Sequence, residues 1–194
     1  PDYNGALRTG DNLFTASIVA LDVYTGEYRW HFQQVHHDIW DFDAPNPVVL
    51  FDLDYNSVLR KGLAQAGKTG WVYILDRISG EPLVGIDERP VPQEPRQATA
   101  ATQPYPAGDS FVSQTLDIPP EGFRLVNNGA IFTPFWEDPV LLRRSEANWP
   151  PSTVDPVKGV MYVCAGERQA AYSTREGVEQ VENGERYTGG SMSF

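Results

Sequence analysis

Three copies of a short turn motif constrain the fold of this chain more than any other feature. In each copy an aspartate is followed four residues later by a glycine, at residues 22–26, 76–80 and 155–159. An aspartate side chain accepts hydrogen bonds from turn amides, and glycine adopts the positive φ that such turns need. The motif therefore predicts β-hairpins, and its recurrence at intervals of tens of residues favours a repetitive architecture such as the blades of a propeller.

Short segments with a strand-like pattern adjoin these turns. Residues 17–21 before the first turn are apolar, residues 28–32 after it alternate, and residues 160–164 follow the third turn. Short runs of this kind bounded by turn signals are typical of strands, and no amphipathic helix of about 12 residues or more is evident. We therefore predict an all-β chain, with a loop-rich surface excursion over residues 85–147, where Pro, Gln, Thr and Ala are frequent.

The first turn carries an additional signal, because Trp30 lies eight residues after Asp22. Such an indole can leave its own strand and pack flat against the next blade, with its N–H bound to a backbone acceptor. The alternative is an ordinary hairpin whose tryptophan belongs to its own core.

The composition excludes several classes of protein. A net charge of −11 over 194 residues argues against binding nucleic acid or anionic lipid through bulk charge. No apolar run approaches the roughly 18–20 residues of a membrane-spanning helix. The single cysteine, Cys164, excludes an internal disulfide framework, and its apolar neighbours predict that it is buried.

The side chains most able to do chemistry are concentrated in residues 35–47 and just before them. All the histidines of the chain and three carboxylates lie there, namely His31, His36, His37, Asp38, Asp41 and Asp43. One interpretation is a metal site, such as that of a hydrolase, and the alternative is a solvated acidic loop. Because adjacent residues of a strand point to opposite faces, His36 and His37 could not easily share one ion, and we expect structural roles for both.

Two of these carboxylates are placed to act together. Asp41 and Asp43 are two residues apart and can face the same side, with Trp40 as an apolar anchor beside them. Neighbouring carboxylates are costly unless a cation lies between them or one is protonated. The pair therefore predicts a bound cation or a shared proton.

The sequence resembles the pyrroloquinoline quinone (PQQ) dependent dehydrogenases, which oxidise alcohols and sugars. The resemblance lies in Ala-x-Asp-x-x-Thr-Gly-x-x-x-Trp at residues 20–30 and His-His-Asp-Ile-Trp-Asp-Phe-Asp at residues 36–43. The double histidine and Lys-Thr-Gly at residues 68–70 look closest to the glucose dehydrogenase branch, whereas Asn-Trp-Pro-Pro at residues 148–151 looks like the alcohol-oxidising members.

The resemblance implies a fold and an extent. The family fold is an eight-bladed β-propeller with the quinone in its central channel, of which residues 1–194 would form roughly three blades. Since the chain lacks an initiator methionine and ends in a strand-like segment, we expect an internal piece of a longer polypeptide. The family's remaining metal ligands lie upstream, so we expect the 194 residues alone to be inactive.

The resemblance also implies roles for individual residues. Asp41 matches the catalytic base, and Lys68 matches the cation that hydrogen-bonds the reactive quinone oxygens. Asn148 matches a PQQ-contacting asparagine, with Trp149 lining the same pocket. Asp41 and Asp43 would bind the metal, which is Ca²⁺, Mg²⁺ or a lanthanide. The alternatives are an exposed turn lysine for Lys68 and a turn cap for Asn148.

The function implied by the resemblance is oxidation of the CH–OH group of a small alcohol or sugar. The hydride passes to PQQ, an aspartate acts as general base and a metal acts as Lewis acid. A cytochrome or ubiquinone would accept the electrons, and the compartment would be the periplasm. Two alternatives stay open: a non-catalytic propeller scaffold and a His/Asp metal hydrolase, the latter needing more histidines outside the cluster.

Overall fold

The regular secondary structure of the described residues consists almost entirely of short strands. A computed structural model describes residues 3–55, 57–117, 119–123, 125–145, 147–175 and 188–193. The predicted all-β fold class is confirmed, and within these ranges no helix is long and apolar enough to cross a membrane. The elements are β1 (Ser17–Leu21), β2 (Tyr28–Gln33), β3 (Val49–Tyr55), β4 (Val58–Ala66), β5 (Val72–Asp76), β6 (Ile86–Pro90), η1 (Pro95–Gln97), β7 (Thr102–Pro106), η2 (Asn127–Gly129), β8 (Val140–Ser145), β9 (Thr153–Asp155), β10 (Val160–Tyr162), β11 (Glu167–Thr174) and β12 (Gly190–Ser193).

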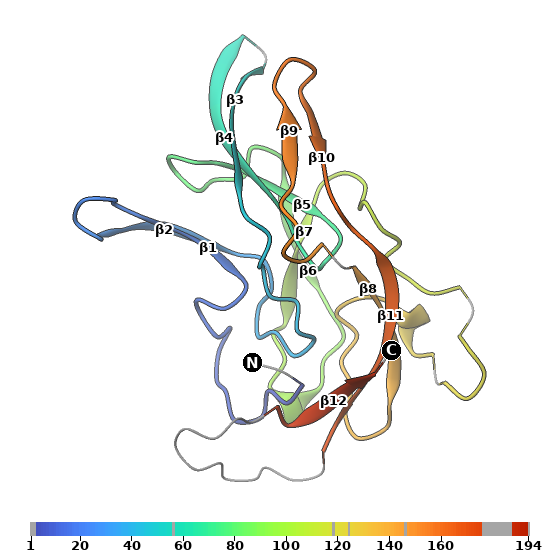
Figure 1. The fold of residues 1–194 in the computed structure, drawn as a ribbon. Coiled ribbons are helices and arrows are strands. Elements are labelled where there is room, and N and C mark those ends of the chain that lie inside the picture. Colours follow the sequence, from blue (N-terminus) through green and yellow to red (C-terminus); the bar gives the residue numbers. More distant parts are fainter. Residues whose placement is uncertain are drawn as a thin grey trace.

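The described strands form separate antiparallel sheets. Consecutive strands pair in β1–β2, β3–β4–β5, β6–β7 and β9–β10, whereas β8 pairs with β11, which also pairs with β12. The β1–β2 and β3–β4 hairpins extend away from the body, and β9 lies beside β3 (Figure 1). Mostly local pairing of this kind agrees with the hairpin repeats expected from the sequence.

The repeated turn motif folds as predicted. In each copy the aspartate Oδ1 accepts hydrogen bonds from the amides two and three residues later, at 2.8–3.1 Å. The glycine that closes each turn has a positive φ, of 73° at Gly26, 79° at Gly80 and 64° at Gly159. The first and third turns join paired strands, and the second returns the chain to a single bridge between Leu75 and Pro82.

Trp30 packs against the neighbouring sheet, which decides between the two alternatives that the sequence left open. Its side chain is buried in a cluster with Leu63 of β4 and Leu75 of β5. The ring lies against the backbone of the second turn, where a Cβ added to Gly80 would be 2.7 Å from Trp30 Cδ2. The indole thus joins the β1–β2 hairpin to the β3–β4–β5 sheet.

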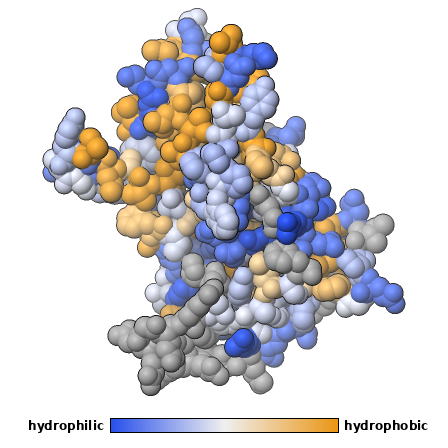
Figure 2. Space-filling model, in the orientation of Figure 1, coloured by the Kyte–Doolittle hydropathy of each residue, from blue (hydrophilic) through white to orange (hydrophobic). Residues whose placement is uncertain are grey.

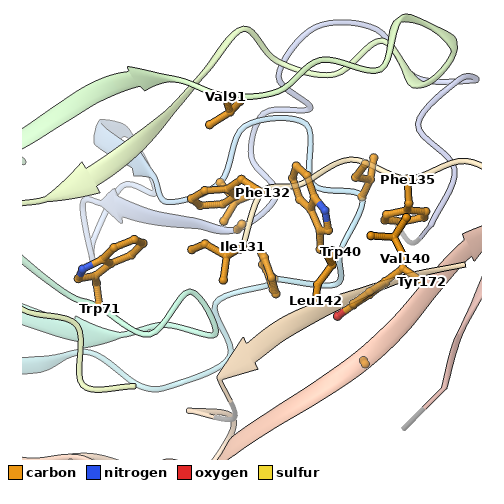
Figure 3. Packing of buried hydrophobic residues seen from close by; sticks show 14 of the residues in the cluster. Trp40, Trp71, Val91, Ile131, Phe132, Phe135, Val140, Leu142 and Tyr172 are labelled. Atoms are coloured by element: carbon orange, nitrogen blue, oxygen red, sulfur yellow. The ribbon is translucent and has the colours of Figure 1, made fainter. Parts of the chain in front are cut away.

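The main core lies where the segment after β2 meets β8 and β11. Trp40, Phe132, Phe135, Leu142 and Tyr172 are each at most 2% exposed. The aromatic rings among them pack closely, with Trp40 against Phe132 and Phe135 beside Tyr172 (Figure 3). Residues far apart in the sequence therefore position the loop that follows β2.

Two expectations from the sequence are corrected by the fold. Residues 85–147 are not merely a surface excursion, because they contain β6, β7 and β8 and supply Phe132 and Phe135 to the core. Cys164 is exposed rather than buried, because β10 ends at Tyr162 and the cysteine follows it in an irregular segment. In both cases local composition does not report the tertiary environment.

A groove with a mainly apolar lining lies between β3–β5 and the β9–β10 hairpin. It has a volume of about 880 Å³, and its lining includes Phe51, Leu53, Ile74, Val154 and Met161. Figure 2 shows apolar side chains gathered over the upper part of the molecule, where these hairpins lie.

The first prediction follows from the contact between Trp30 and Gly80. Gly80→Ala and Gly26→Ala both place a Cβ at a positive φ, which costs about 1–2 kcal/mol for an L-residue. Only the Cβ at position 80 meets Trp30, whereas nothing lies within 4 Å of the one at position 26. We expect Gly80→Ala to lower the free energy of unfolding in urea clearly more than Gly26→Ala. Equal losses would contradict the packing of Trp30 on this turn.

Candidate functional site

The side chains of residues 40–43 alternate between the core and a charged cluster. Trp40 and Phe42 are each 1% exposed and stack with their ring centroids 5.8 Å apart. The Trp40 Nε1 donates a hydrogen bond to the Thr133 carbonyl at 2.8 Å. Trp40 is therefore the predicted apolar anchor, and Asp41 and Asp43 face the same cation, as their spacing predicts.

Lys68 is the cation between the two carboxylates. Its Nζ donates to Asp43 Oδ1 at 2.6 Å and to Asp41 Oδ2 at 3.3 Å. The side chain is only 6% exposed, so the alternative of an exposed turn lysine is wrong. Lys68 reaches the pair from the tight turn between β4 and β5, in which Gly67 accepts a hydrogen bond from the amide of Gly70.

A second cation, which the sequence analysis did not single out, completes the cluster. Arg144 of β8 donates from Nη2 to Asp41 Oδ2 at 2.7 Å, and its side chain is 5% exposed. An arginine in a strand that otherwise begins with buried Val140, Leu141 and Leu142 needs an acidic partner. That signal was present in the sequence, but it did not indicate which carboxylate was the partner.

The two aspartates have opposite pKa shifts. Burial opposes ionisation of Asp41, but hydrogen bonds with Asp43 and Arg144 and the charges of Lys68 and Arg144 hold its pKa below the ordinary value. Burial, together with the hydrogen bond and charge of Asp41, raises the pKa of Asp43. Asp41 is thus the more readily ionised carboxyl of the pair, and Asp43 is the more readily protonated one.

The segment before the pair contains a buried acid. Asp38 is 1% exposed and accepts a hydrogen bond from the Trp40 amide through Oδ1 at 2.8 Å. Burial raises its pKa to about 7, with a further contribution from the nearby charges of Asp41 and Asp43. This carboxyl is therefore largely neutral below pH 7.

Asn148 and Trp149 lie beyond the end of β8. The Asn148 carbonyl accepts a hydrogen bond from Asn46 Nδ2 at 3.1 Å, which places it beside the segment that carries the carboxylates. Its own Oδ1 is buried without a hydrogen-bond partner among the described residues, so the side chain is not a turn cap. Trp149 is 75% exposed. No hydrogen bond joins either side chain to Lys68 or Asp41 in the part of the chain that the structure describes.

The histidines bind protein groups, as expected for structural roles. His36 contacts Gln33 Oε1 and Glu88 Oε1 through its two ring nitrogens, both at 3.0 Å. His37 is fully buried, with Nδ1 2.7 Å from the Gly10 carbonyl. Neither histidine approaches the carboxylate pair through these contacts.

The pair fits a hard metal ion as part of a ligand set. Carboxylate oxygens are the ligands that Ca²⁺ and Mg²⁺ prefer, but no group of three or more His, Cys, Asp or Glu side chains within the described ranges could hold a metal. A metal bound to both Asp41 and Asp43 would compete with the Lys68 ammonium for the same oxygens. Lys68 and the Asn148 Oδ1, which has no hydrogen-bond partner among the described residues, also offer a buried donor and acceptor to a polar organic cofactor.

Comparison with known proteins identifies the family. A family model described as the β-propeller domain of PQQ-type glucose/ethanol/alcohol dehydrogenases matches residues 1–189. The chain belongs to this family. It is 35% identical over 119 residues to quinoprotein glucose dehydrogenase of Escherichia coli K12 and 39% identical over 114 residues to the glycerol dehydrogenase large subunit of Gluconobacter oxydans 621H. These matches cover 61% and 55% of this chain but 15% of each relative.

Solved structures of this kind share the fold. Quinohemoprotein alcohol dehydrogenase ADHIIG from Pseudomonas putida HK5 matches 99% of this chain and 26% of its own, with a TM-score of 0.62 and 23% identity. A europium-containing methanol dehydrogenase matches 98% of this chain and 30% of its own, with a TM-score of 0.61 and 21% identity. The predicted fold class, part of an eight-bladed β-propeller, is confirmed.

The second prediction for this PQQ-family chain follows from the buried carboxyl of Asp38. Because the pKa of Asp38 is raised in the folded state, that state binds more protons than the unfolded state between about pH 4 and 7. The contribution of Asp38 to the free energy of unfolding therefore falls as pH rises through this window. Asp38→Asn keeps an acceptor for the Trp40 amide and cannot ionise. Its stability relative to the unaltered protein should rise by about 4 kcal/mol from pH 4 to pH 8, measured by urea unfolding, and a constant difference would contradict the shift.

Proposed function

We propose that this chain is the cofactor-facing part of a PQQ-dependent dehydrogenase that oxidises the CH–OH group of an alcohol or sugar. The observation that carries the proposal is the cluster in which Asp41 and Asp43 share the buried ammonium of Lys68. These are the residues that the family resemblance assigns to the base, the metal ligand and the quinone-binding cation. A non-catalytic scaffold needs its turn motifs and Trp30 but has no need to bury this charged group.

Each residue of the cluster has a distinct task in this proposal. Asp41, held ionised, accepts the proton of the substrate hydroxyl. Lys68 donates a charge-assisted hydrogen bond toward the oxygen on which negative charge develops. PQQ, when bound, supplies the hydride acceptor. The Asn148 amide oxygen, which no described residue hydrogen-bonds, would form part of its pocket with Trp149 beside it.

Asp41 and Asp43 would hold the metal ion, with the remaining ligands coming from elsewhere. Ca²⁺ and Mg²⁺ match the carboxylate oxygens, and a lanthanide, as a trivalent ion, compensates the second carboxylate better. Such an ion acts as a Lewis acid and favours the ionised form of the neighbouring carboxylates.

The remaining assignments follow from the family. Relatives of this chain are named as glucose, glycerol and alcohol dehydrogenases, and one is named 1-butanol dehydrogenase (cytochrome c). We propose a small alcohol or sugar as substrate, a cytochrome or ubiquinone as electron acceptor and the periplasm as compartment. Nucleic acid is not a partner in this proposal, since the net charge is −11.

The first test of the proposed function addresses Asp41, the proposed general base. In the full-length protein, Asp41→Asn should lower kcat by about 10²–10⁴-fold, which is the usual contribution of general base catalysis, while PQQ still binds. Asp52→Asn is the matched control, because Asp52 is a half-exposed aspartate that pairs with Arg77 on the β3–β4–β5 sheet. Near-normal turnover of Asp41→Asn at saturating substrate would rule out Asp41 as the base.

The second test addresses the quinone-binding cation. Lys68→Ala should lower kcat by about 10²–10³-fold, as for loss of one donor to a developing oxyanion. Lys68→Arg should retain much of the activity, because both side chains donate to an oxyanion. The absorption spectrum of bound PQQ provides an independent readout. If Lys68→Ala changed neither kcat nor this spectrum, the lysine would serve only the ion pairs seen here.

The third test separates the candidate metals. Metal-free full-length protein is reconstituted with PQQ and either Ca²⁺ or La³⁺, with and without Asp43→Ala. If Asp43 binds the metal, the substitution should raise the half-saturating metal concentration, and more for La³⁺ than for Ca²⁺, because the trivalent ion gains more from each carboxylate. Full activity with Ca²⁺ alone that Asp43→Ala left unchanged would remove Asp43 from the metal site.

A further inference from the structure

Arg144 contacts both the side chain of the candidate base, Asp41, and the backbone carbonyl of the residue before it, Trp40. Its Nη2 donates to Asp41 Oδ2 at 2.7 Å, and its Nη1 lies 3.1 Å from the Trp40 carbonyl oxygen. Nη1 also lies 3.0 Å from the Tyr172 hydroxyl on β11, which holds the guanidinium in place from the side of the sheet. One planar fork thus binds two consecutive residues of the loop that carries the carboxylates.

The backbone at this point needs such support. Asp41 has a φ of 63°, in the left-handed region that an L-residue other than glycine adopts only where its surroundings hold it. Three hydrogen bonds fix the preceding residue: the Trp40 ring to Thr133, the Trp40 amide to Asp38, and the Trp40 carbonyl to Arg144. Of these partners, only Arg144 also binds the carboxylate itself.

The two cations divide the carboxylates between them. Lys68 is closer to Asp43, at 2.6 Å, than to Asp41, at 3.3 Å, and Arg144 is the closer partner of Asp41. Both ion pairs of Asp41 in the described residues use Oδ2. Arg144 is therefore the main partner that sets the direction of the Asp41 carboxylate, and Lys68 is the main partner of Asp43.

We infer that Arg144 is a positioning residue for the base: it binds Asp41 Oδ2 and the Trp40 carbonyl so that the second oxygen of Asp41 is presented to the substrate hydroxyl. This inference rests on the proposed function, because it assigns Arg144 a task in the same reaction. Arg144 itself does not touch the reacting atoms in this assignment.

The test compares two adjacent arginines of β8 in the full-length protein. Arg144→Met should lower kcat by about 10²-fold, the cost of a misplaced catalytic group, with KM and the dissociation constant for PQQ unchanged. Arg143→Met is the matched control. Its guanidinium lies on the other face of the strand, where Nε donates to the Thr115 carbonyl at 3.2 Å, so its loss should leave kcat unchanged.

A conservative variant and a binding measurement keep the inference testable if Arg144→Met is unstable. Arg144→Lys retains the charge but cannot bind the Trp40 carbonyl and Asp41 together, so it should fold and show a smaller but clear loss of kcat. Normal kcat in folded Arg144→Lys or Arg144→Met would overturn the inference. Weakened PQQ binding with normal kcat at saturating PQQ would also overturn it, since Arg144 would then act on the cofactor. If the unaltered protein showed no PQQ-dependent turnover, the proposed function itself would fail.

Discussion

Neighbouring carboxylates in a half-buried loop require cations, and this requirement links distant parts of the chain. Asp41 and Asp43 follow β2, Lys68 comes from the turn after β4, and Arg144 comes from β8. None of these segments could bury its charge alone, because an unpaired buried ion is strongly disfavoured. The cluster therefore forms only when the separate sheets are assembled, and its geometry depends on that assembly.

Apolar packing puts the charges in reach of one another. Trp40 and Phe42 are buried in the core, and the aspartates that alternate with them contact Lys68 instead. Phe132 and Tyr172, from segments about a hundred residues later, complete the same core. Trp30 performs a similar task between hairpins, where its ring covers the glycine of the next turn. The packing contacts are thus apolar, and the two aspartates lie on the polar side of the loop, where Lys68 and Arg144 reach them from other segments.

The pKa values of Asp41 and Asp43 shift in opposite directions, and the two carboxylates are paired unequally with the cations. Asp41 receives both cations on one oxygen and stays ionised, whereas Asp43 shares Lys68 and lies beside a second negative charge. Two like groups whose pKa values differ in this way can take different roles, and in the proposed function only Asp41 acts as the base in addition to binding the metal. The family to which the chain belongs gives these roles a chemical context.

The sequence by itself determined the local features of this protein. The aspartate–glycine turns, the all-β class, the anchoring of Trp40 and the shared side of Asp41 and Asp43 all follow from residue spacing, because they depend on neighbours within a few positions. Only the tertiary structure decided that residues 85–147 enter the core, that Cys164 is exposed, and that Arg144 is the partner of Asp41. The core and the Arg144–Asp41 pair depend on contacts between segments about a hundred residues apart, and the exposure of Cys164 depends on where β10 ends. A pattern within a short window carries no information about any of these.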